Sequence, residues 1–453
     1  MFMLIHDLKL ALQSFRRNQF LTALTIGAIS AGIAAAMITM TLYHARSGHP
    51  IGWKEDKLFA VTMDTRGSDH KSEEGAKHPE YPPFELTYRD ARALYRSDIP
   101  THSVMMYTTD RVVDPGLGGV KPFSIVARVT TADFFSMFDV PFLYGAGWNR
   151  SSDEAPEPVV VIGRRLNDKL FKGVNSVGRS VTLSGREYRI VGILQTWMPT
   201  PRYYDLSGDA FRTAEDVFMP FGWGITLQMA TVGNIRCVTP DAKMESFNDI
   251  LTADCVWLQY WVELPSAQRL RKFQQFVDNY ALEEKRHGRF ARPLNNRVVD
   301  IPTWFVMNDV IGDDSRMELV LASLFLAVCI FNTLGLMLAK FLGTSHITGL
   351  RRALGASRGD VMRQHLTEVM VVGLLGGVVG TGLAWSGLWA IRVMTYIPTD
   401  DDSEKLALAQ SLSHMDLEML LIALLISVLT GVIAGLYPAW RIGRMAPAVF
   451  LKS

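Results

Sequence analysis

Four long apolar runs divide the chain. Each is 21 to 26 residues long and lacks Asp, Glu, Lys, Arg and His, and they occupy residues 18–43, 319–339, 369–391 and 419–440. An α-helix rises about 1.5 Å per residue, so each run is long enough to cross a hydrocarbon core of about 30 Å. A helix also satisfies its own backbone polar groups in lipid. The pattern predicts four transmembrane helices, at residues 19–43, 317–340, 368–392 and 418–440.

A cleaved signal peptide is the alternative for the first run, because Ala34, Ala35 and Ala36 offer a small-residue processing site. The apolar core of a signal peptide is usually about 7 to 15 residues long, and this run is longer. We therefore expect the first helix to be retained.

Basic residues cluster beside three ends of these helices, and cytoplasmic segments carry the excess of Lys and Arg. They are Lys9, Arg16 and Arg17; Lys340, Arg351, Arg352, Arg358 and Arg363; and Arg441, Arg444 and Lys452. The loop at 393–417 instead carries four acids at 400–404. We expect both termini, the link at 341–367 and the tail at 441–453 to be cytoplasmic. Residues 44–316 and 393–417 then lie outside.

The outside segment mixes strand-like and helix-like patterns. A helix at 265–284 stands between strands at 255–263 and 297–301, which is a βαβ-like order. Other predicted strands cover 58–63, 124–129, 158–162, 180–183 and 188–194, and residues 149–158 are predicted to be a polar connection. The fold class is therefore a four-helix transmembrane domain with a large α+β domain between its first and second helices.

The positions of the three cysteines matter for whether a disulfide can form. Cys329 lies in the second apolar run, whereas Cys237 and Cys255 lie in the outside segment. An oxidising compartment permits a disulfide between them. The residues alone leave open whether they form that bond or two buried free thiols.

No catalytic or metal-binding pattern stands out. The chain has no Gly-x-Ser-x-Gly elbow, no His-Glu-x-x-His pair and no Cys-x-x-Cys knuckle, and Asp400 to Asp402 fit a solvated loop better than a cation site. Ionisable residues flank the apolar runs rather than entering them, which argues against an ion pump. We expect a chain that is not an enzyme and holds no metal.

Nucleotide and nucleic acid are likewise not predicted as ligands of this chain. It has no phosphate-binding Gly-x-x-x-x-Gly-Lys-Ser/Thr loop, and its net charge is only +1. Any ATP and Mg²⁺ would therefore be bound by a separate partner.

The first 18 residues suggest a helix on the inner leaflet. Leu4, Leu8, Leu12 and Phe15 recur at helical spacing ahead of two arginines. Such an amphipathic helix would contact membrane lipid; a simple cytoplasmic extension of the first span is the alternative.

The third apolar run is rich in glycine, including Gly373, Gly376, Gly377 and Gly380. Small residues four apart let helix backbones approach closely. Packing within the chain and packing between two chains both fit.

Several segments, in the right order along nearly the whole chain, resemble the MacB/FtsX-type permeases of ABC transporters. Residues 7–18 resemble the N-terminal motif of that family, and residues 436–441 with Pro447 resemble its C-terminal motif. The outside segment is similar at 133–135, 159–162, 170–171, 177–178 and 191–193. The most specific resemblance runs from Gly349 through Leu350, Arg351, Arg352, Ala353, Leu354, Gly355, Ala356 and Ser357 to Arg358, followed by Gln364, Leu366 and Glu368.

The resemblance implies a dimeric permease in a bacterial inner membrane that works with a cytoplasmic ABC ATPase by mechanotransmission. In the family, the segment after the second span docks on the ATPase. The residues expected to couple here are Gly349, Arg351, Arg352, Ala353, Gly355, Ala356 and Ser357. The resemblance also implies a periplasmic domain with a Porter-like part and a Sabre-like insert at about 144–222.

One departure from the family pattern bears on the partner. Family members usually carry an Arg and a Glu just before the Gly of the coupling segment, where this chain has Thr344 and Ile347. Loss of that charged pair favours a heterodimer with a second permease over a homodimer.

Two functions follow as hypotheses. The first is export of amphipathic compounds, peptides or lipoproteins, with a periplasmic adaptor and an outer-membrane channel as further partners. The alternative is an FtsX-like regulator that activates a cell-wall hydrolase and transports nothing.

Overall fold

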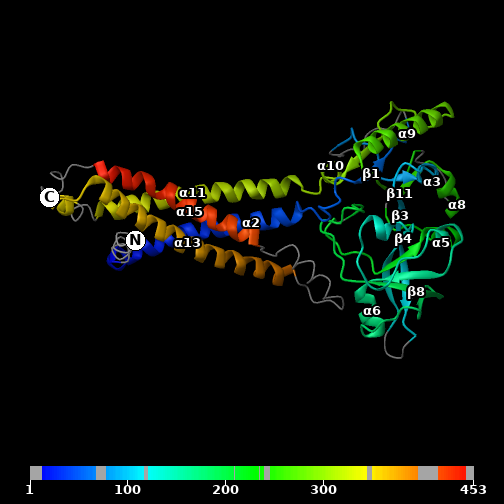
Figure 1. Cartoon of the computed structure of the whole chain (residues 1–453), viewed down its shortest axis with the longest axis horizontal. Helices are drawn as coiled ribbons and strands as arrows, with labels where there is room; N and C mark the ends of the chain where they lie inside the picture. The colour runs from blue at the N-terminus through cyan, green and yellow to red at the C-terminus, as the bar shows by residue number, and fades with distance from the viewer. Residues whose placement is uncertain are drawn as a thin grey trace. The chain divides into compact units, whose positions relative to one another are not determined.

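The computed structural model describes residues 13–67, 78–116, 121–208, 210–233, 235–238, 245–343, 349–352, 354–395 and 417–444. The chain divides into two compact units (Figure 1). One, the membrane unit, comprises residues 1–47 and 311–453; the other, the periplasmic unit, comprises residues 48–310.

The membrane unit is built from four long helices. They are α2 (Gln19–Arg46), α11 (Asp313–Gly343), α13 (Arg358–Thr395) and α15 (Leu417–Arg444). Among the described residues, these four are long and apolar enough to cross a membrane. Helix α13 packs against α2 and α15, and α11 packs against α2. Their shared core is apolar and includes Ile29, Ile33, Met337, Val369 and Ala423.

Two of these helices extend well beyond their apolar runs. Helix α13 begins at Arg358, ten residues before the predicted start at 368, and α11 continues to Gly343. The extensions are helical because hydrogen bonding along the backbone does not require apolar side chains. Residues 13–17 are also helical, and Asn18 separates them from α2. Of the predicted amphipathic face, Phe15 packs on the core, whereas Leu4, Leu8 and Leu12 lie outside the described residues.

The periplasmic unit contains one mixed sheet of twelve strands within its described part. Its main order is β12-β1-β11-β3-β4-β9-β6-β8-β5, with β2 and β10 beside β11 and with β7 beside β3 and β8. The strands are β1 (Leu58–Thr62), β2 (Leu86–Thr87), β3 (His102–Asp114), β4 (Phe123–Thr130), β5 (Phe142–Gly145), β6 (Val159–Ile162), β7 (Ser180–Leu183), β8 (Arg186–Leu194), β9 (Val217–Pro220), β10 (Arg236–Cys237), β11 (Cys255–Glu263) and β12 (Arg297–Asp300).

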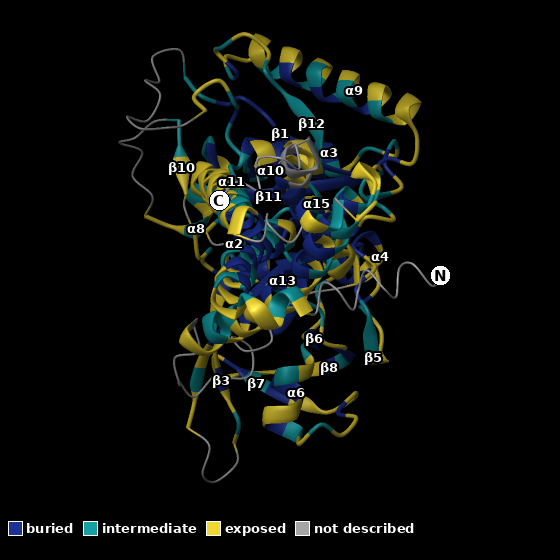
Figure 2. Ribbon diagram, turned by 90° about the vertical axis from the view of Figure 1, so that its left-hand side faces the viewer, coloured by how far each residue is buried: buried dark blue, intermediate teal, exposed yellow. Residues whose placement is uncertain are grey.

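Helices cover both faces of this sheet, and two apolar cores lie beneath them. Helix α9 packs through Phe273, Val277 and Ala281 and exposes its other side (Figure 2). The helices are α3 (Tyr88–Tyr95), α4 (Phe134–Met137), α5 (Ser151–Glu154), α6 (Arg164–Phe171), α7 (Phe221–Thr226), α8 (Phe247–Thr252), α9 (Ala267–Arg286) and α10 (Ile301–Met307).

Each predicted strand and the predicted long helix have a counterpart in the structure. The order β11-α9-β12 is the expected βαβ pattern, with β1 antiparallel between the two strands. The polar connection at 149–158 differs, because it contains the short helix α5. The predicted insert at 144–222 supplies β6 to β9, which extend the common sheet through parallel pairing of β9 with β4.

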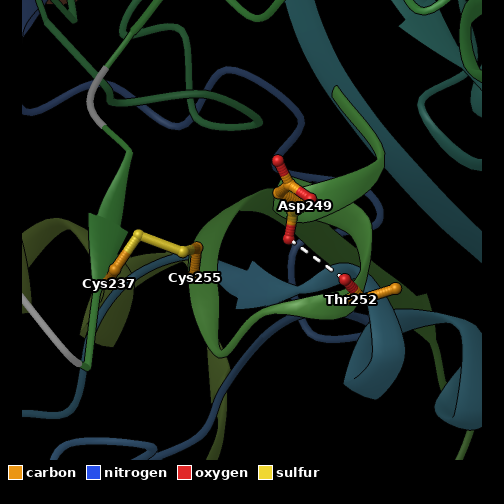
Figure 3. Close-up of a disulfide and its surroundings, with 4 residues drawn as sticks. All are labelled: Cys237, Asp249, Thr252 and Cys255. Carbon is orange, nitrogen blue, oxygen red and sulfur yellow. Dashed lines mark hydrogen bonds between the residues drawn. A yellow bond between two sulfur atoms is a disulfide. The ribbon is translucent and has the colours of Figure 1, made fainter. Parts of the chain in front are cut away.

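A disulfide joins Cys237 of β10 to Cys255 of β11, which face each other in the ladder (Figure 3). The loop that it closes contains α8, whose N-terminus has a reciprocal cap between Ser246 and Asp249. The bond therefore ties both ends of the segment that contains α8 to the start of β11. Cys329 is a buried free thiol in α11.

A fully buried ionic cluster fastens the chain at 200–216 to the sheet. Arg128 of β4 bonds both Asp205, at 2.5 Å, and Glu215. Arg202 donates to Glu215 at 2.7 Å, and the Tyr204 hydroxyl donates to the same carboxylate at 3.0 Å. Burial raises the pKa of the Asp205 carboxyl, but the Arg128 and Arg202 guanidiniums outweigh it and hold that pKa below its ordinary value. Two buried guanidiniums thus balance two buried carboxylates, and the partly exposed Arg212 lies 3.6 Å from Asp205 at the border of the cluster.

Candidate coupling site

The predicted coupling segment forms a short helical turn followed by a sharp reversal. The Leu354 N–H donates to the Leu350 carbonyl at 3.0 Å, and the Ala356 N–H donates to the Arg351 carbonyl at 3.1 Å. Gly355 has a φ of +106°, in the left-handed region that favours glycine. Glycine at this position therefore ends the turn and lets the chain enter α13.

Ser357 caps α13 from the other side of the reversal. Its hydroxyl accepts from the Asp360 N–H at 3.1 Å, while the Asp360 carboxylate accepts from the Ser357 N–H at 3.2 Å. This reciprocal pair is a capping box. The Arg351 guanidinium also donates to the Gln364 side chain at 2.8 Å, so the turn is tied to the first part of α13.

The turn presents two apolar side chains. Leu350 is 55% exposed and Leu354 is 81% exposed, and residues four apart lie on the same side of a helix. Of the other predicted coupling residues, Gly349 is buried and Arg352 is half-buried. Ala353 lies outside the described residues, as do Thr344 and Ile347.

A polar junction, defined here as Ser14, Thr22, Lys340, His365 and Glu368, lies beside the ends of this segment within the membrane unit. The Lys340 ammonium is 2.7 Å from a Glu368 carboxylate oxygen and donates to the Thr22 hydroxyl at 2.8 Å. The Ser14 hydroxyl donates to the same Glu368 oxygen at 2.6 Å. The Lys340 and Glu368 side chains are only 1% and 3% exposed.

The junction brings together four segments that are far apart in sequence. Ser14 comes from the helical turn before α2, Thr22 from α2, Lys340 from α11, and Glu368 from α13. Lys340 also lies over the Phe15 ring at 4.8 Å. His365 packs on Phe341 with ring centroids 4.2 Å apart and lies 3.9 Å from Glu368. These contacts attach the helical turn at residues 13–17 to both helices that flank the coupling segment.

The burial of this junction is not evident from the sequence. Lys340 and Glu368 directly flank their apolar runs, as predicted, and His365 stands three residues before Glu368, yet all three side chains are buried. The sequence places Lys340 and Glu368 at the borders of apolar runs, where topology-setting charges also lie. One local signal points to the junction. Lys340 directly follows one apolar run and Glu368 directly precedes another, and in both cases the helix continues beyond the charged residue.

The glycines of α13 face two different neighbours in the same chain. Gly373 and Gly377 pack on α15, where the Ser427 hydroxyl donates to the Gly373 carbonyl at 2.8 Å. Gly376 and Gly380 pack on α2, where the Ser30 hydroxyl donates to the Gly376 carbonyl at 3.0 Å. The structure thus assigns all four to packing within the chain, one of the two alternatives that the sequence left open.

Gly377→Val should destabilise the membrane unit strongly, whereas Gly382→Val should not. A methyl carbon at Gly377 would overlap the Ser427 side chain, but one at Gly382 meets nothing within 4 Å. Overpacking typically costs about 1–3 kcal/mol, and both variants carry the same change in helix propensity, because each replaces Gly with Val. Thermal unfolding of the purified full chain in detergent would measure the difference. Equal melting temperatures for the two variants would contradict this packing.

Within the described residues, no group of three or more His, Cys, Asp or Glu is placed to hold a metal ion. The features that stand out in the membrane unit are an exposed turn, a braced reversal and a buried polar junction.

Comparison with known families covers both units. Residues 22–274 match the model of the MacB-like periplasmic core domain, and residues 319–447 match that of the FtsX-like permease C-terminal domain. The chain belongs to the MacB/FtsX-type permeases of ABC transporters. Its four long helices and its α+β unit between the first two are the architecture expected of such a permease.

Curated relatives include ATP-binding/permease proteins. The chain is 23% identical over 438 residues to the pyoverdine export ATP-binding/permease protein PvdT of Pseudomonas fluorescens, covering 96% of this chain and 57% of the relative. It is 23% identical over 483 residues to the macrolide export ATP-binding/permease protein MacB of Syntrophobacter fumaroxidans, covering 98% and 63%. The permease therefore spans about three fifths of the length of these relatives.

Among solved structures, the periplasmic region of MacB from Actinobacillus actinomycetemcomitans matches 58% of this chain and 96% of its own. The sequence identity is 11% and the TM-score is 0.35. The extracellular domain of YknZ, a noncanonic ABC-type transporter from Gram-positive bacteria, matches 53% of this chain and 100% of its own, with 14% identity and a TM-score of 0.33.

Proposed function

We propose that this chain is the permease subunit of a MacB-like complex in a bacterial inner membrane, with both termini in the cytoplasm. ATP and Mg²⁺ are bound by an ABC ATPase in a separate partner chain. Hydrolysis there moves the periplasmic unit by mechanotransmission, and the complex exports amphipathic compounds, peptides or lipoproteins. This subunit has no catalytic role of its own.

The observation that carries the proposal is the exposed Leu350 and Leu354 pair on a braced turn. Exposed apolar side chains on a rigid turn suit a groove in a partner protein, because binding then costs little conformational entropy. Gly355 and the Ser357 cap fix the turn relative to α13. A push on the turn would therefore be carried into the helix rather than absorbed by the loop.

The polar junction supports the same mechanism. Through Lys340 and Glu368 it links α11, α13 and the segment that precedes α2. The side chains of a buried ion pair move together, because separating them would leave a buried charge without its partner. A displacement at the coupling segment would thus reach α2 and α11, the two helices whose other ends adjoin the periplasmic unit in sequence.

A second permease completes the complex, and the residues at 344 and 347 favour a different chain over a second copy. The printed names of the relatives, which combine ATP binding with permease, support an ATPase as a partner. A periplasmic adaptor and an outer-membrane channel would complete an export path.

Copurification with the ATPase would test the coupling surface. The double variant Leu350→Asp and Leu354→Asp should retain at most a tenth of the ATPase that the wild type retains, because carboxylates at the centre of an apolar contact are costly to desolvate. Leu294→Asp, at an exposed leucine of the periplasmic unit, is the matched control and should retain all of it.

If the wild type retains no ABC ATPase, or if the double variant retains as much as the control, the proposal fails. The same preparation separates the two functions. An adaptor and channel would support export, whereas a peptidoglycan hydrolase in their place would support the FtsX-like regulator.

A further inference from the structure

A cleft of about 870 Å³ opens on the periplasmic unit. Its walls are α3 with the chain that follows it, α5, and the start of α7, and its floor includes Ser103 and Met105 of β3. Its volume falls in the range of about 300–1,000 Å³ that is usual for small-molecule sites. It lies where the segment at 144–222 meets the rest of the sheet.

One face of α3 forms the first wall. Tyr88, Arg92, Tyr95 and Arg96 all line the cleft, at a spacing that puts them on one side of the helix. Tyr88 stacks on Phe221 of α7 with ring centroids 6.3 Å apart, so an aromatic pair bridges two walls.

The opposite wall is held rigidly. Asp153 of α5 accepts from the Ala132 N–H at 2.8 Å and from the Trp148 indole at 3.1 Å. The backbone of Gly222 packs so closely on the Asp153 carbonyl that any side chain there would overlap it. Behind it, Arg150 is paired with Asp133. The cleft is therefore preformed by contacts that do not depend on a ligand.

Several charges in the cleft have no ionic partner. In the described part of the chain, Arg92, Arg96, Asp98 and Glu154 are exposed and form no ion pair, and the Arg92 side chain lies against the Tyr88 ring instead. Burial raises the pKa of the Asp153 carboxyl to about 6, so it is mainly ionised at neutral pH. The α3 wall thus carries two unpaired cations, with the unpaired Asp98 just after them in the chain, and the α5 wall carries the carboxylates of Asp153 and Glu154.

We propose that this cleft binds a zwitterionic, amphipathic ligand of peptide type. Arg92 and Arg96 hold its carboxylate, since guanidinium groups match carboxylates in shape and charge. Asp153 and Glu154 hold its ammonium, and the Tyr88 and Phe221 rings pack on the apolar part between them. That such a ligand is cargo rests on the proposed function. Binding of the ligand in the cleft does not require the ATPase.

Calorimetry on the full chain in lipid nanodiscs would test the site with three probes. They are the tripeptide Ala-Phe-Ala with free ends, its C-terminal amide and its N-acetyl form. The wild type should bind the free peptide at least tenfold more tightly than either blocked form, because each block removes one charge. The double variant Arg92→Ala and Arg96→Ala should bind the free peptide at least tenfold more weakly and no longer prefer it over the amide.

Two further variants complete the design. Glu154→Gln should reduce the preference for the free peptide over the N-acetyl form and leave the preference over the amide intact. Arg89→Ala is the matched control, because Arg89 lies on the same helix but does not line the cleft. All the altered side chains are exposed, so near-wild-type melting temperatures are expected and check the fold.

The inference is overturned if the three peptides bind the wild type equally or not at all, or if Arg89→Ala weakens binding as much as the double variant. None of these measurements includes the ATPase. Loss of peptide binding with ATPase retention intact would therefore reject the cleft alone, and the reverse result would reject the coupling proposal alone.

Discussion

Replacing Lys340 with Met should lower the free energy of unfolding of the membrane unit by about 3–5 kcal/mol. The change leaves the Glu368 carboxylate buried without its cation, and the Ser14 hydroxyl cannot neutralise it. The Lys340 and Glu368 side chains are only 1% and 3% exposed, so water cannot readily take the place of the ammonium. Unfolding of the purified chain in mixed detergent, followed by circular dichroism, would measure the loss.

Matched variants distinguish the effect of breaking the buried Lys340–Glu368 pair from the effect of losing a charge in general. Arg316→Met removes an exposed partner of Asp313 in the same helix, where the nitrogen and oxygen are 3.9 Å apart, and should cost less than about 1 kcal/mol. The double variant Lys340→Met and Glu368→Met removes both charges and should recover most of the stability. If Lys340→Met behaves like Arg316→Met, the buried pair is not important for stability.

The double variant also tests the junction as a mechanical link. It should fold like the wild type. The permease should nevertheless change the ATP hydrolysis rate of its partner less than the wild type does, because methionine side chains do not hold α11, α13 and Ser14 in one fixed arrangement. Glu368→Gln supplies a milder second variant should the Met substitution prevent folding. Full ATPase stimulation by a stable double variant would show that the junction only stabilises the fold.

Replacing Arg128 with Met should destabilise the periplasmic unit by a similar amount, about 3–5 kcal/mol. Asp205 and Glu215 would then lose the one buried guanidinium that contacts them both, and would keep only Arg202 and the partly exposed Arg212, which lies 3.6 Å from Asp205. Urea unfolding followed by tryptophan fluorescence is suitable, because Trp197 and Trp261 belong to the core beside the cluster. Arg189→Met, which loses an exposed pair with Glu157, should change stability by less than about 1 kcal/mol.

The pH dependence of this second effect has a definite sign. The pKa of Asp205 in the folded chain is below its ordinary value of 3.8, so the stability that this group contributes is complete above pH 3.8. It is lost as the pH falls below 3.8 towards the folded pKa. The gap between wild type and Arg128→Met should therefore be widest at neutral pH and should narrow in acid. A constant gap down to pH 2 would contradict the assignment of the charges.

Much of the membrane unit could be predicted from local sequence. Uncharged runs of more than 20 residues have few alternatives to a spanning helix, and the glycine spacing in the third run predicted close helix contacts. The turn at Gly355 and the cap at Ser357 also follow from local residue preferences. These features depend on neighbours within a few positions, which is why periodicity and motifs reveal them.

The sequence alone therefore determined the spans and the α+β class of the unit between the first two, whereas the coupling segment at 349–357 stays a prediction. Only the tertiary structure decided which charges meet. Lys340 and Glu368 look like ordinary flanking residues until α11 and α13 pack, and Ser14 reaches Glu368 from 354 positions away. Arg128 finds Asp205 and Glu215 across 77 and 87 positions, and the walls of the cleft come from α3, α5 and α7. The physical reason is that desolvation and pairing of a charge depend on what packs against it, and those partners come from segments whose approach no local pattern records.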